Sequence, residues 1–419
     1  MNDDVMIEPA RSLPVFAEVD VVVVGGGIAG VSAAVAAARN GVSVCLLEKE
    51  CSLGGLATLG NVIIYLPLCD GRGNQVIGGI GEELLKLSIQ NNTQPIPGMR
   101  VDHRIPEGWE PGGDSEERLK HRYRVGFNPV DFMMEIERWI LQNKVDLWYD
   151  TRFCDVVREG RTIRAVIVEN KSGRGAIRCK SVIDASGDAD VCARAGEPTE
   201  SLSTNVRCAW YYYLEDGEVR LHSFSSRFNQ DGTLAEDSGA THAGDVGRDV
   251  TDHVTGSRRL VHKLIHDRAE ASETGAVHPI LIPTIPSFRM TRRLRGEIEL
   301  EMDHEREWFD DCVGMTGDWR KPGLVFYIPL RTLAGVANDN LLAAGRCMSA
   351  TGSAWDMARV IPTCAVTGEG AGTAAAEMVL SGNTSIGDIH LEALQERLRA
   401  QKVHIDRSFA DERESNIIG

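Results

Sequence analysis

The sequence predicts an α/β fold in which a parallel sheet and a β-meander form one domain, interrupted by an α+β segment that contains an antiparallel sheet. Near the N-terminus, residues 21–39 have the pattern of a β-branched strand, a glycine turn and an alanine-rich helix. Near the C-terminus, residues 340–377 repeat this style with an apolar strand, a Gly-Arg turn and a small-residue helix. The segment between them differs in composition, which indicates one domain built from two separated pieces.

The first strand, turn and helix have the features of a Rossmann-like dinucleotide site. The run Val21–Val24 has the length and composition of a buried parallel strand, and it ends in the motif Gly25-x-Gly27-x-x-Gly30. The first glycine permits a tight turn, the second lets the backbone approach a pyrophosphate, and the third lets the helix pack closely on the strand. Glu48 ends the next apolar run, where it can accept hydrogen bonds from an adenosine ribose. This unit alone leaves FAD, NAD and NADP open.

The remaining elements follow in chain order. After a glycine-rich loop at residues 54–60 we expect helices at 82–89 and 132–141, and then a β-meander of strands at 145–149, 153–158, 162–169 and 176–179. A buried strand at 181–185 ends in a glycine turn, antiparallel strands begin at 206–214, and a helix covers 260–271. The last elements are a strand at 340–344, a helix at 362–377 with proline in its first turn, and an amphipathic helix at 391–401.

These elements predict three parts. A discontinuous nucleotide-binding domain comprises residues 17–198 and 326–385, and a substrate domain comprises residues 199–325. Residues 386–419 form a C-terminal helical segment. A chain of 419 residues is long enough for more than one domain.

The composition excludes several classes of protein. Apolar residues make up 42% and charged residues 25%, which is the balance of an ordinary globular protein. The net charge of −16 argues against nucleic acid or an anionic membrane as a partner. We expect no membrane span, because no apolar run approaches the ~20 residues that a span needs. The ten cysteines include no Cys-x-x-Cys pair, so we expect no metal site and a reduced, cytoplasmic setting.

Five further motifs occur in order along the chain. They are Gly54-Gly55-x-x-Thr58-x-Gly60, Ile183-Asp-Ala-Ser-Gly-Asp188, Arg289-x-Thr291-Arg-Arg293, Ala344-Gly-Arg-Cys-x-Ser-Ala-Thr351 and Arg359-Val-x-Pro-Thr-Cys364. Together they make the chain resemble the FAD-dependent oxidoreductases with a glutathione-reductase-type FAD-binding domain. More closely, it resembles the branch of that family grouped with the A-type subunits of heterodisulfide reductase, from about residue 18 to residue 404.

The resemblance implies that FAD is the cofactor, with its pyrophosphate on the first glycine motif. Glu48 would hold the adenosine ribose beside Lys49, and Phe153 would contact adenine through its backbone. Gly345 and Arg346 stand where the wider superfamily has a Gly-Asp pair for the ribityl chain. The helix that follows would aim its N-terminus at flavin N1 and O2. The cofactor residues expected in all are Gly25, Gly27, Ile28, Ala29, Gly30, Glu48, Lys49, Gly54, Gly55, Leu56, Thr58, Phe153, Ser186, Gly187, Asp188, Gly345, Arg346, Arg359, Pro362 and Thr363.

The expected reaction is hydride transfer between a small organic substrate and flavin N5, with the protein supplying position and electrostatics. Arg292 is a catalytic candidate for binding an anion or stabilising reduced flavin, although arginines in ordinary surface ion pairs have the same pattern. Cys347 is a candidate redox-active or flavin-contacting thiol, although free cysteines are often simply buried. His242 or His253 could act as a general base, or each could be an ordinary core or surface histidine.

Two other functions stay open at this point. The chain could be a flavin-binding electron-transfer subunit of a heterodisulfide-reductase-like complex, which would need iron–sulfur cysteines here or on a partner. It could also carry a metabolite, as thiazole synthases do, and bind an NAD-derived adduct. A flavin disulfide reductase is disfavoured, because residues 56–61 lack the cysteine pair of that class. The sequence identifies neither the substrate nor the electron acceptor, and it is compatible with a possible homo-oligomer.

Overall fold

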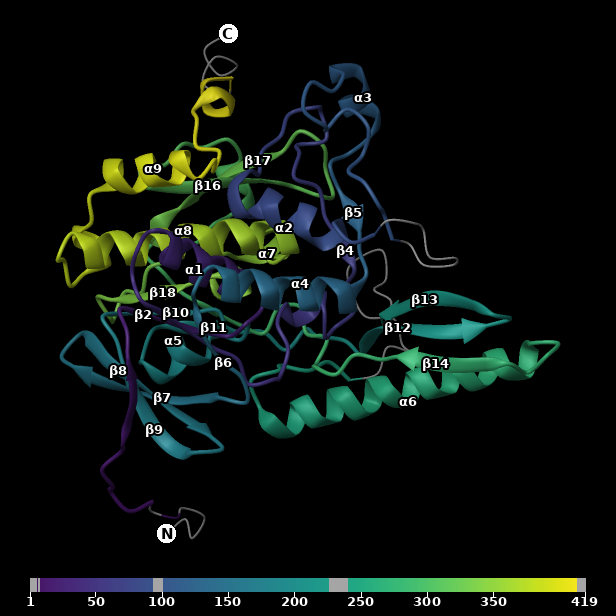
Figure 1. The fold of residues 1–419 in the computed structure, drawn as a ribbon, viewed down its shortest axis with the longest axis horizontal. Helices are drawn as coiled ribbons and strands as arrows, with labels where there is room; N and C mark the ends of the chain where they lie inside the picture. Colours follow the sequence, from purple (N-terminus) through teal and green to yellow (C-terminus); the bar gives the residue numbers. More distant parts are fainter. Residues whose placement is uncertain (1–5, 7, 93–100, 226–239, 413–419) are drawn as a thin grey trace.

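The computed structural model describes residues 6, 8–92, 101–225 and 240–412 (Figure 1). Its centre is a five-stranded sheet in the order β18-β10-β2-β3-β6, with every neighbouring pair parallel. The strands are β2 (Val21–Val24), β3 (Val44–Leu47), β6 (Asp146–Trp148), β10 (Ser181–Asp184) and β18 (Leu341–Ala343). The sheet therefore joins the two ends of the chain, as the sequence predicts.

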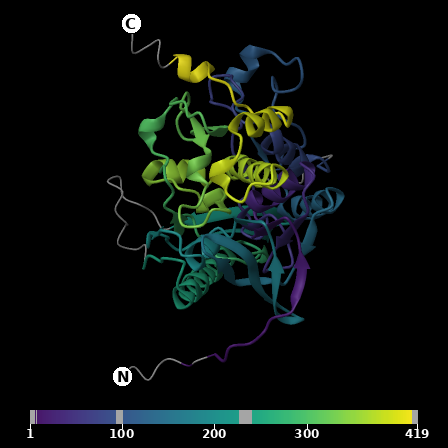
Figure 2. The same ribbon diagram turned by 90° about the vertical axis from the view of Figure 1, so that its left-hand side faces the viewer.

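The parallel sheet is the middle of three layers, which Figures 1 and 2 show with helices on one side and the meander on the other. Val21 and Val23 of β2 pack in the core on the helix side, whereas Val22 and Val24 pack in the core on the meander side. Successive side chains of a strand point to opposite faces, so both sets are buried. This double burial explains the unbroken valine run.

Two small-residue helices lie side by side in the helical layer: α1 (Ile28–Arg39) and α8 (Ile361–Leu380). A Cβ atom added at Gly368 would lie 2.2 Å from the carbonyl oxygen of Ala29. One added at Gly372 would lie 2.2 Å from that of Ala33. Glycine is therefore required at both positions for α8 to approach the backbone of α1 so closely.

A second sheet in the order β1-β9-β8-β7 forms the outer layer. Its strands are β1 (Val15–Glu18), β7 (Arg152–Glu159), β8 (Thr162–Asn170) and β9 (Gly173–Arg178). The last three form the expected meander, but the prediction that residues 145–149 belong to it is wrong. Those residues form β6, which pairs with β3 at the edge of the parallel sheet. The intervening helix α4 (Pro129–Gln142) returns the chain to the start of the sheet, so a parallel pairing follows.

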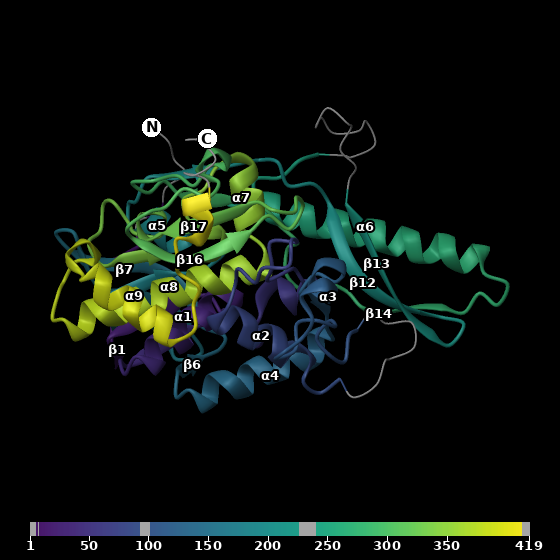
Figure 3. The same ribbon diagram turned by 90° about the horizontal axis from the view of Figure 1, so that it is seen from above.

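The middle segment contains a three-stranded antiparallel sheet in the order β13-β12-β14, and helix α6 packs on it. The elements are β12 (Cys208–Glu215), β13 (Glu218–Ser225), α6 (Gly247–Ala271) and β14 (Val277–Leu281). Figures 1 and 3 show this unit extending outward from the three layers. Tyr211 and Tyr213 of β12 form a small separate core with Val261 and Ile265 of α6.

Helix α6 begins well before the predicted start at residue 260. The buried residues of its first half are His253, Gly256 and Ser257, none of which is a large apolar side chain. The apolar periodicity that predicts a helix is therefore missing there, although the backbone is helical.

The other elements complete the fold. They are β4 (Ile64–Tyr65), α2 (Gly79–Ile89), α3 (Ser115–Lys120), β5 (Val125–Gly126), α5 (Asp190–Arg194), β11 (Thr199–Ser201), β15 (Arg292–Leu294), β16 (Cys312–Gly317), β17 (Val325–Pro329), α7 (Gly352–Ala358) and α9 (Leu391–Ala400). Strands β16 and β17 pair across the expected boundary at residue 325, and β16 lies against α8. The predicted fold class is confirmed, whereas the exact division into domains stays a prediction. Residues 93–100, 226–239 and 413–419 of the expected parts lie outside the described residues.

None of the helices within the described ranges combines the length and the apolar character needed to cross a bilayer.

Glu369 is a buried carboxyl group in the middle of α8. Its Oε2 accepts a hydrogen bond of 2.8 Å from the backbone N–H of Ile80, at the start of α2. Its Oε1 is buried and has no hydrogen-bond partner among the described residues. Burial raises the pKa of Glu369 to about 8, and the nearby charge of Glu83 acts in the same direction. The folded protein therefore keeps this group protonated near neutral pH.

We predict that the titration of Glu369 makes the free energy of unfolding fall as the pH rises from about 6 to about 8. Its pKa in an unfolded chain is near 4.5, so unfolding releases a proton in this range and a higher pH favours it. Glu369→Gln stays neutral, so its free energy of unfolding should gain about 2 kcal/mol over that of the wild type across this range. Urea unfolding at both pH values measures this difference.

The control is Glu377→Gln on the same helix, where the carboxylate is paired with Arg397. If Glu369→Gln and the wild type lose the same stability between the two pH values, Glu369 does not titrate as described.

Candidate functional site

A cleft of about 450 Å³ lies where the strands of the parallel sheet end. The segments that follow the carboxyl ends of β2, β3, β10 and β18 all line it. This edge of a parallel sheet is where ligands of such folds usually bind. Expected cofactor residues that line the cleft are Gly25, Gly27, Ile28, Ala29, Glu48, Lys49, Gly54, Gly55, Leu56, Ser186, Gly187, Asp188, Gly345, Arg346 and Arg359.

Glycine occupies each of the three positions of the first motif for a different structural reason. Gly25 has a positive φ of +104°, and a Cβ there would lie 2.4 Å from the carbonyl oxygen of Ala185. A Cβ at Gly30 would lie 1.7 Å from the carbonyl oxygen of Gly25, so this residue serves helix packing and does not line the cleft. A Cβ at Gly27 would meet no atom within 4 Å. Because Gly27 also lines the cleft, this open space is available to a ligand.

The N-termini of α1 and α8 both face the cleft. Ile28 and Ala29 line it from the first turn of α1, and Ile361 and Cys364 line it from the first turn of α8. Neither helix has a side-chain hydrogen bond at its N-cap. The first N–H groups of a helix lack partners within the helix and carry a positive partial charge. The cleft therefore offers two places that favour negative charge.

The carboxylate of Glu48 is held in place by the backbone. Its Oε2 accepts a hydrogen bond of 2.6 Å from the N–H of Gly26, and its Oε1 accepts one of 2.9 Å from the N–H of Glu50. Burial raises the pKa of Glu48, and these two donors lower it in part. The same side chain lines the cleft, so its orientation towards a ligand is fixed in advance.

Four other expected cofactor residues do not line the cleft. The hydroxyl of Thr58 donates to the carbonyl of Leu53 at 2.5 Å. The side chain of Phe153 packs against the core on the meander side, while its neighbour Arg152 lines the cleft. Pro362 and Thr363 are buried in the first turn of α8. Their roles in binding, including the backbone contact of Phe153, stay predictions.

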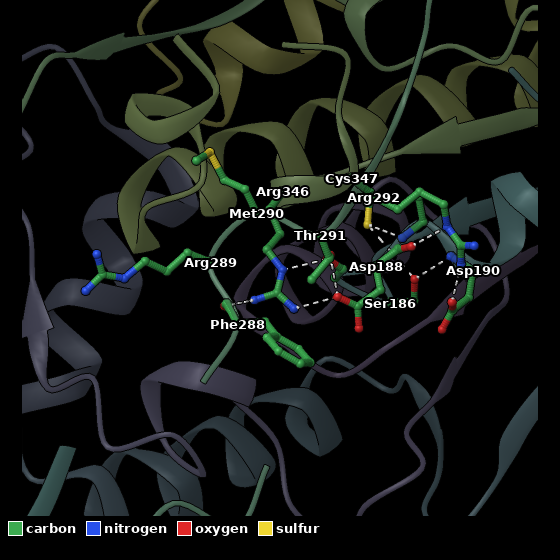
Figure 4. A network of polar contacts seen from close by, with 12 residues as sticks. Ser186, Asp188, Asp190, Phe288, Arg289, Met290, Thr291, Arg292, Arg346 and Cys347 are labelled. Atoms are coloured by element: carbon green, nitrogen blue, oxygen red, sulfur yellow. Dashed lines mark hydrogen bonds and ion pairs between the residues drawn. The ribbon is translucent and has the colours of Figure 1, made fainter. Parts of the chain in front are cut away.

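The side chain of Arg346 joins three segments of the chain, as Figure 4 shows. Its Nε donates to the carbonyl of Gly187 at 2.5 Å, and its Nη1 donates to the carbonyl of Phe288 at 2.8 Å. Its Nη2 donates to Asp188, whose carboxylate also accepts a hydrogen bond of 2.6 Å from Thr291. Arg346 thus fixes the turn after β10 and the inserted segment to the turn after β18.

The two catalytic candidates lie beside this network but do not line the cleft. Arg292 donates to the carbonyl of Asp188 at 2.9 Å and to the carboxylate of Asp190 at 2.6 Å. The sulfur of Cys347 is fully buried and accepts a hydrogen bond of 3.2 Å from the N–H of Ala189. Burial raises the pKa of the Cys347 thiol well above its usual value, so the thiol stays protonated. Catalytic roles for Arg292 and Cys347 stay predictions.

The histidine candidates for a general base lie together within the inserted segment. The rings of His242 and His253 meet edge to face with centroids 5.3 Å apart. His242 shares a hydrogen bond of 2.6 Å with Asp249, and burial lowers the pKa of His253 to about 4. Neither histidine lines the cleft, but His253 packs on Phe288, which does.

Other residues line the cleft without having been predicted. Ile361 and Cys364 lie in the last motif, next to the expected residues Pro362 and Thr363, so the motif could have identified them. The residues contributed by the inserted segment follow no motif, because they reach the cleft only when that segment folds over it. They are Gly244, Asp245, Gly247, Val250, Ile285, Pro286 and Phe288, and Arg152 and Asp190 join them from the first part of the chain.

Solved structures with a related fold have little sequence in common with this chain. A geranylgeranyl bacteriochlorophyll reductase-like protein from Thermoplasma acidophilum is 13% identical over 94% of this chain and 90% of its own, with a TM-score of 0.44. The Sdh1 complex of Mycobacterium smegmatis is 13% identical over 92% and 72%, with a TM-score of 0.46. The 3-ketosteroid-delta4-(5alpha)-dehydrogenase of Rhodococcus jostii is 15% identical over 86% and 97%, with a TM-score of 0.38. TM-scores this low carry no argument about function.

The family is shown by the sequence. No curated protein matches the chain. The family model described as FAD dependent oxidoreductase matches residues 20–204 and 203–398, which together span most of the chain. The protein therefore belongs to the FAD-dependent oxidoreductase family, whose members are enzymes with FAD as their cofactor.

Proposed function

We propose that this enzyme binds FAD in the cleft and transfers a hydride between a small organic substrate and N5 of the flavin. The observation that carries the proposal is the cleft itself, which contains the open space at Gly27 and is also lined by the N-terminus of α8. FAD supplies the hydride chemistry, while the chain binds and orients the reactants.

The residues present fit such a cofactor. The space at Gly27, together with the N–H groups at the start of α1, suits a pyrophosphate. The fixed carboxylate of Glu48 suits the hydroxyls of an adenosine ribose. The N-terminus of α8 would face the flavin ring, where its positive dipole end favours the negative charge of the reduced state.

The inserted segment supports a substrate domain at residues 199–325, because its antiparallel sheet and α6 have a small core of their own. The three layers of the remaining fold support a glutathione-reductase-type FAD domain at residues 17–198 and 326–385. Membership of the branch grouped with the A-type subunits of heterodisulfide reductase, a cytoplasmic location and a possible homo-oligomer stay predictions, and the electron acceptor stays unidentified.

The alternative of an electron-transfer subunit is not favoured. In the described ranges, the cysteines are free thiols spread along the chain. Among the described residues, one group of three side chains lies close enough together to hold a metal ion. It is the exposed trio His266, Asp267 and Glu270, which contains no cysteine.

We predict that the purified protein is yellow, with flavin absorbance bands near about 370 and about 450 nm. Mass analysis of the released ligand should identify FAD rather than an NAD-derived adduct. Anaerobic addition of a metabolite panel should bleach the longer-wavelength band with the true substrate. A colourless protein that takes up no added FAD would show that the proposal is wrong.

Gly27→Ala tests the position of the pyrophosphate. The φ of Gly27 is −69°, which alanine adopts freely, and the added methyl group meets no protein atom. The apo variant should therefore melt at the wild-type temperature, while its Kd for FAD rises by roughly tenfold or more because the methyl group fills the ligand space. Gly387→Ala is the matched control, because an added Cβ there would come no closer than 3.5 Å to another residue and Gly387 does not line the cleft. Unchanged FAD affinity in Gly27→Ala would place the pyrophosphate elsewhere.

A further inference from the structure

Arg289 differs from the other arginines around the flavin end of the cleft. Four of the others form an ion pair with an aspartate: Arg292 with Asp190, Arg320 with Asp318, Arg346 with Asp188 and Arg359 with Asp356. Arg289 is exposed, and among the described residues no carboxylate lies within ion-pair distance of it. Figure 4 shows its side chain extending away from the Arg346 network, and no dashed line joins its guanidinium to the other residues drawn. Its charge is therefore available to a ligand.

Arg359 lines the cleft, and it shares the carboxylate of its ion-pair partner with a second arginine. Its Nε and Nη2 both donate to one oxygen of Asp356, at 3.0 and 2.5 Å. The other oxygen of Asp356 accepts a hydrogen bond of 3.0 Å from Arg320. The Nη1 of Arg359 has no partner among the described residues. Only 18% of the Arg359 side chain is exposed, so this sharing leaves a mostly buried cation incompletely compensated.

The charges of these arginines affect one another. The pKa of Arg359 is lowered by burial first, and the positive charges of Arg289 and Arg346 lower it further. The pair with Asp356 opposes this effect without removing it. A negative group placed between Arg289 and Arg359 would relieve the repulsion and recover charge-assisted hydrogen bonds.

We propose that the substrate carries a carboxylate, which Arg289 and Arg359 bind beside the N-terminus of α8. The inference rests on the proposed function, which places the reactive end of the flavin there. Asp356 already shows that a carboxylate fits between two guanidinium groups at this place, since Arg320 and Arg359 share it. The substrate carboxylate would be held in a similar way on the other side of Arg359, between Arg359 and Arg289, and would hold the neighbouring carbon near the flavin. Hydroxy, amino and unsaturated carboxylic acids are substrates of this class.

The test uses the FAD-loaded full-length protein and neutral analogues of the same shape. Acetate, succinate and benzoate are titrated beside their amides, and the change in flavin absorbance near about 450 nm reports binding. At least one acid should bind roughly tenfold tighter than its amide or better, and added salt should weaken that preference. Arg289→Gln should remove the preference while the FAD content stays at the wild-type level.

The matched control is Arg295→Gln, which removes an exposed arginine that is paired with Glu299. It should keep the preference for the acid. The inference is overturned if no acid binds better than its amide, if Arg289→Gln keeps the preference, or if methylphosphonate binds better than acetate. The FAD content separates the two hypotheses: a protein that binds no FAD overturns the proposed function as well, whereas an FAD-loaded protein without acid preference overturns only the carboxylate site.

Discussion

Gly368 and Gly372 let α8 lie so close to α1 that a methyl group at either position would collide with a carbonyl oxygen of Ala29 or Ala33. The remaining geometry of the site depends on this approach. One helix follows the glycine turn near the start of the chain, and the other follows β18 more than 300 residues later. Their packing brings both N-termini to the same cleft, where each favours negative charge. Close backbone packing thus brings the two ends of the chain together at the cleft.

The second connection is made by Arg346. Arg346 lies in the turn after β18, and its side chain contacts Gly187 and Asp188 in the turn after β10 and the backbone of the inserted segment at Phe288. The inserted segment is therefore attached at the end of the cleft where the chemistry is proposed, while its own sheet and α6 extend outward. Arg289 follows Phe288 directly, so the same hydrogen bond also fixes the backbone from which the Arg289 side chain extends.

Local patterns in the sequence predicted most of the layered fold and both ends of the cleft. The valine run, the glycine turn and the small-residue helix each follow from close packing of one short segment. Each can therefore be recognised from that segment alone. The assignment of β6 needed the path of α4, and the lining from Gly244 to Phe288 needed the folded insert, so neither could be found locally. Arg292 and Cys347 show a different limit. Their residue types suggested catalysis. The structure pairs Arg292 with Asp190 and buries Cys347 beside Ala189, and a catalytic role for either stays a prediction.

The double use of Glu48 has a consequence for changing the cofactor by protein engineering. One carboxylate oxygen accepts from Gly26 inside the glycine turn and the other from Glu50, while the same side chain lines the cleft. Replacing the acid to accommodate a different nucleotide would leave two backbone N–H groups without an acceptor and loosen the turn itself. In the proposed cofactor site, nucleotide preference and the conformation of the turn would therefore depend on the same carboxylate, and an altered preference would require a compensating change in the turn.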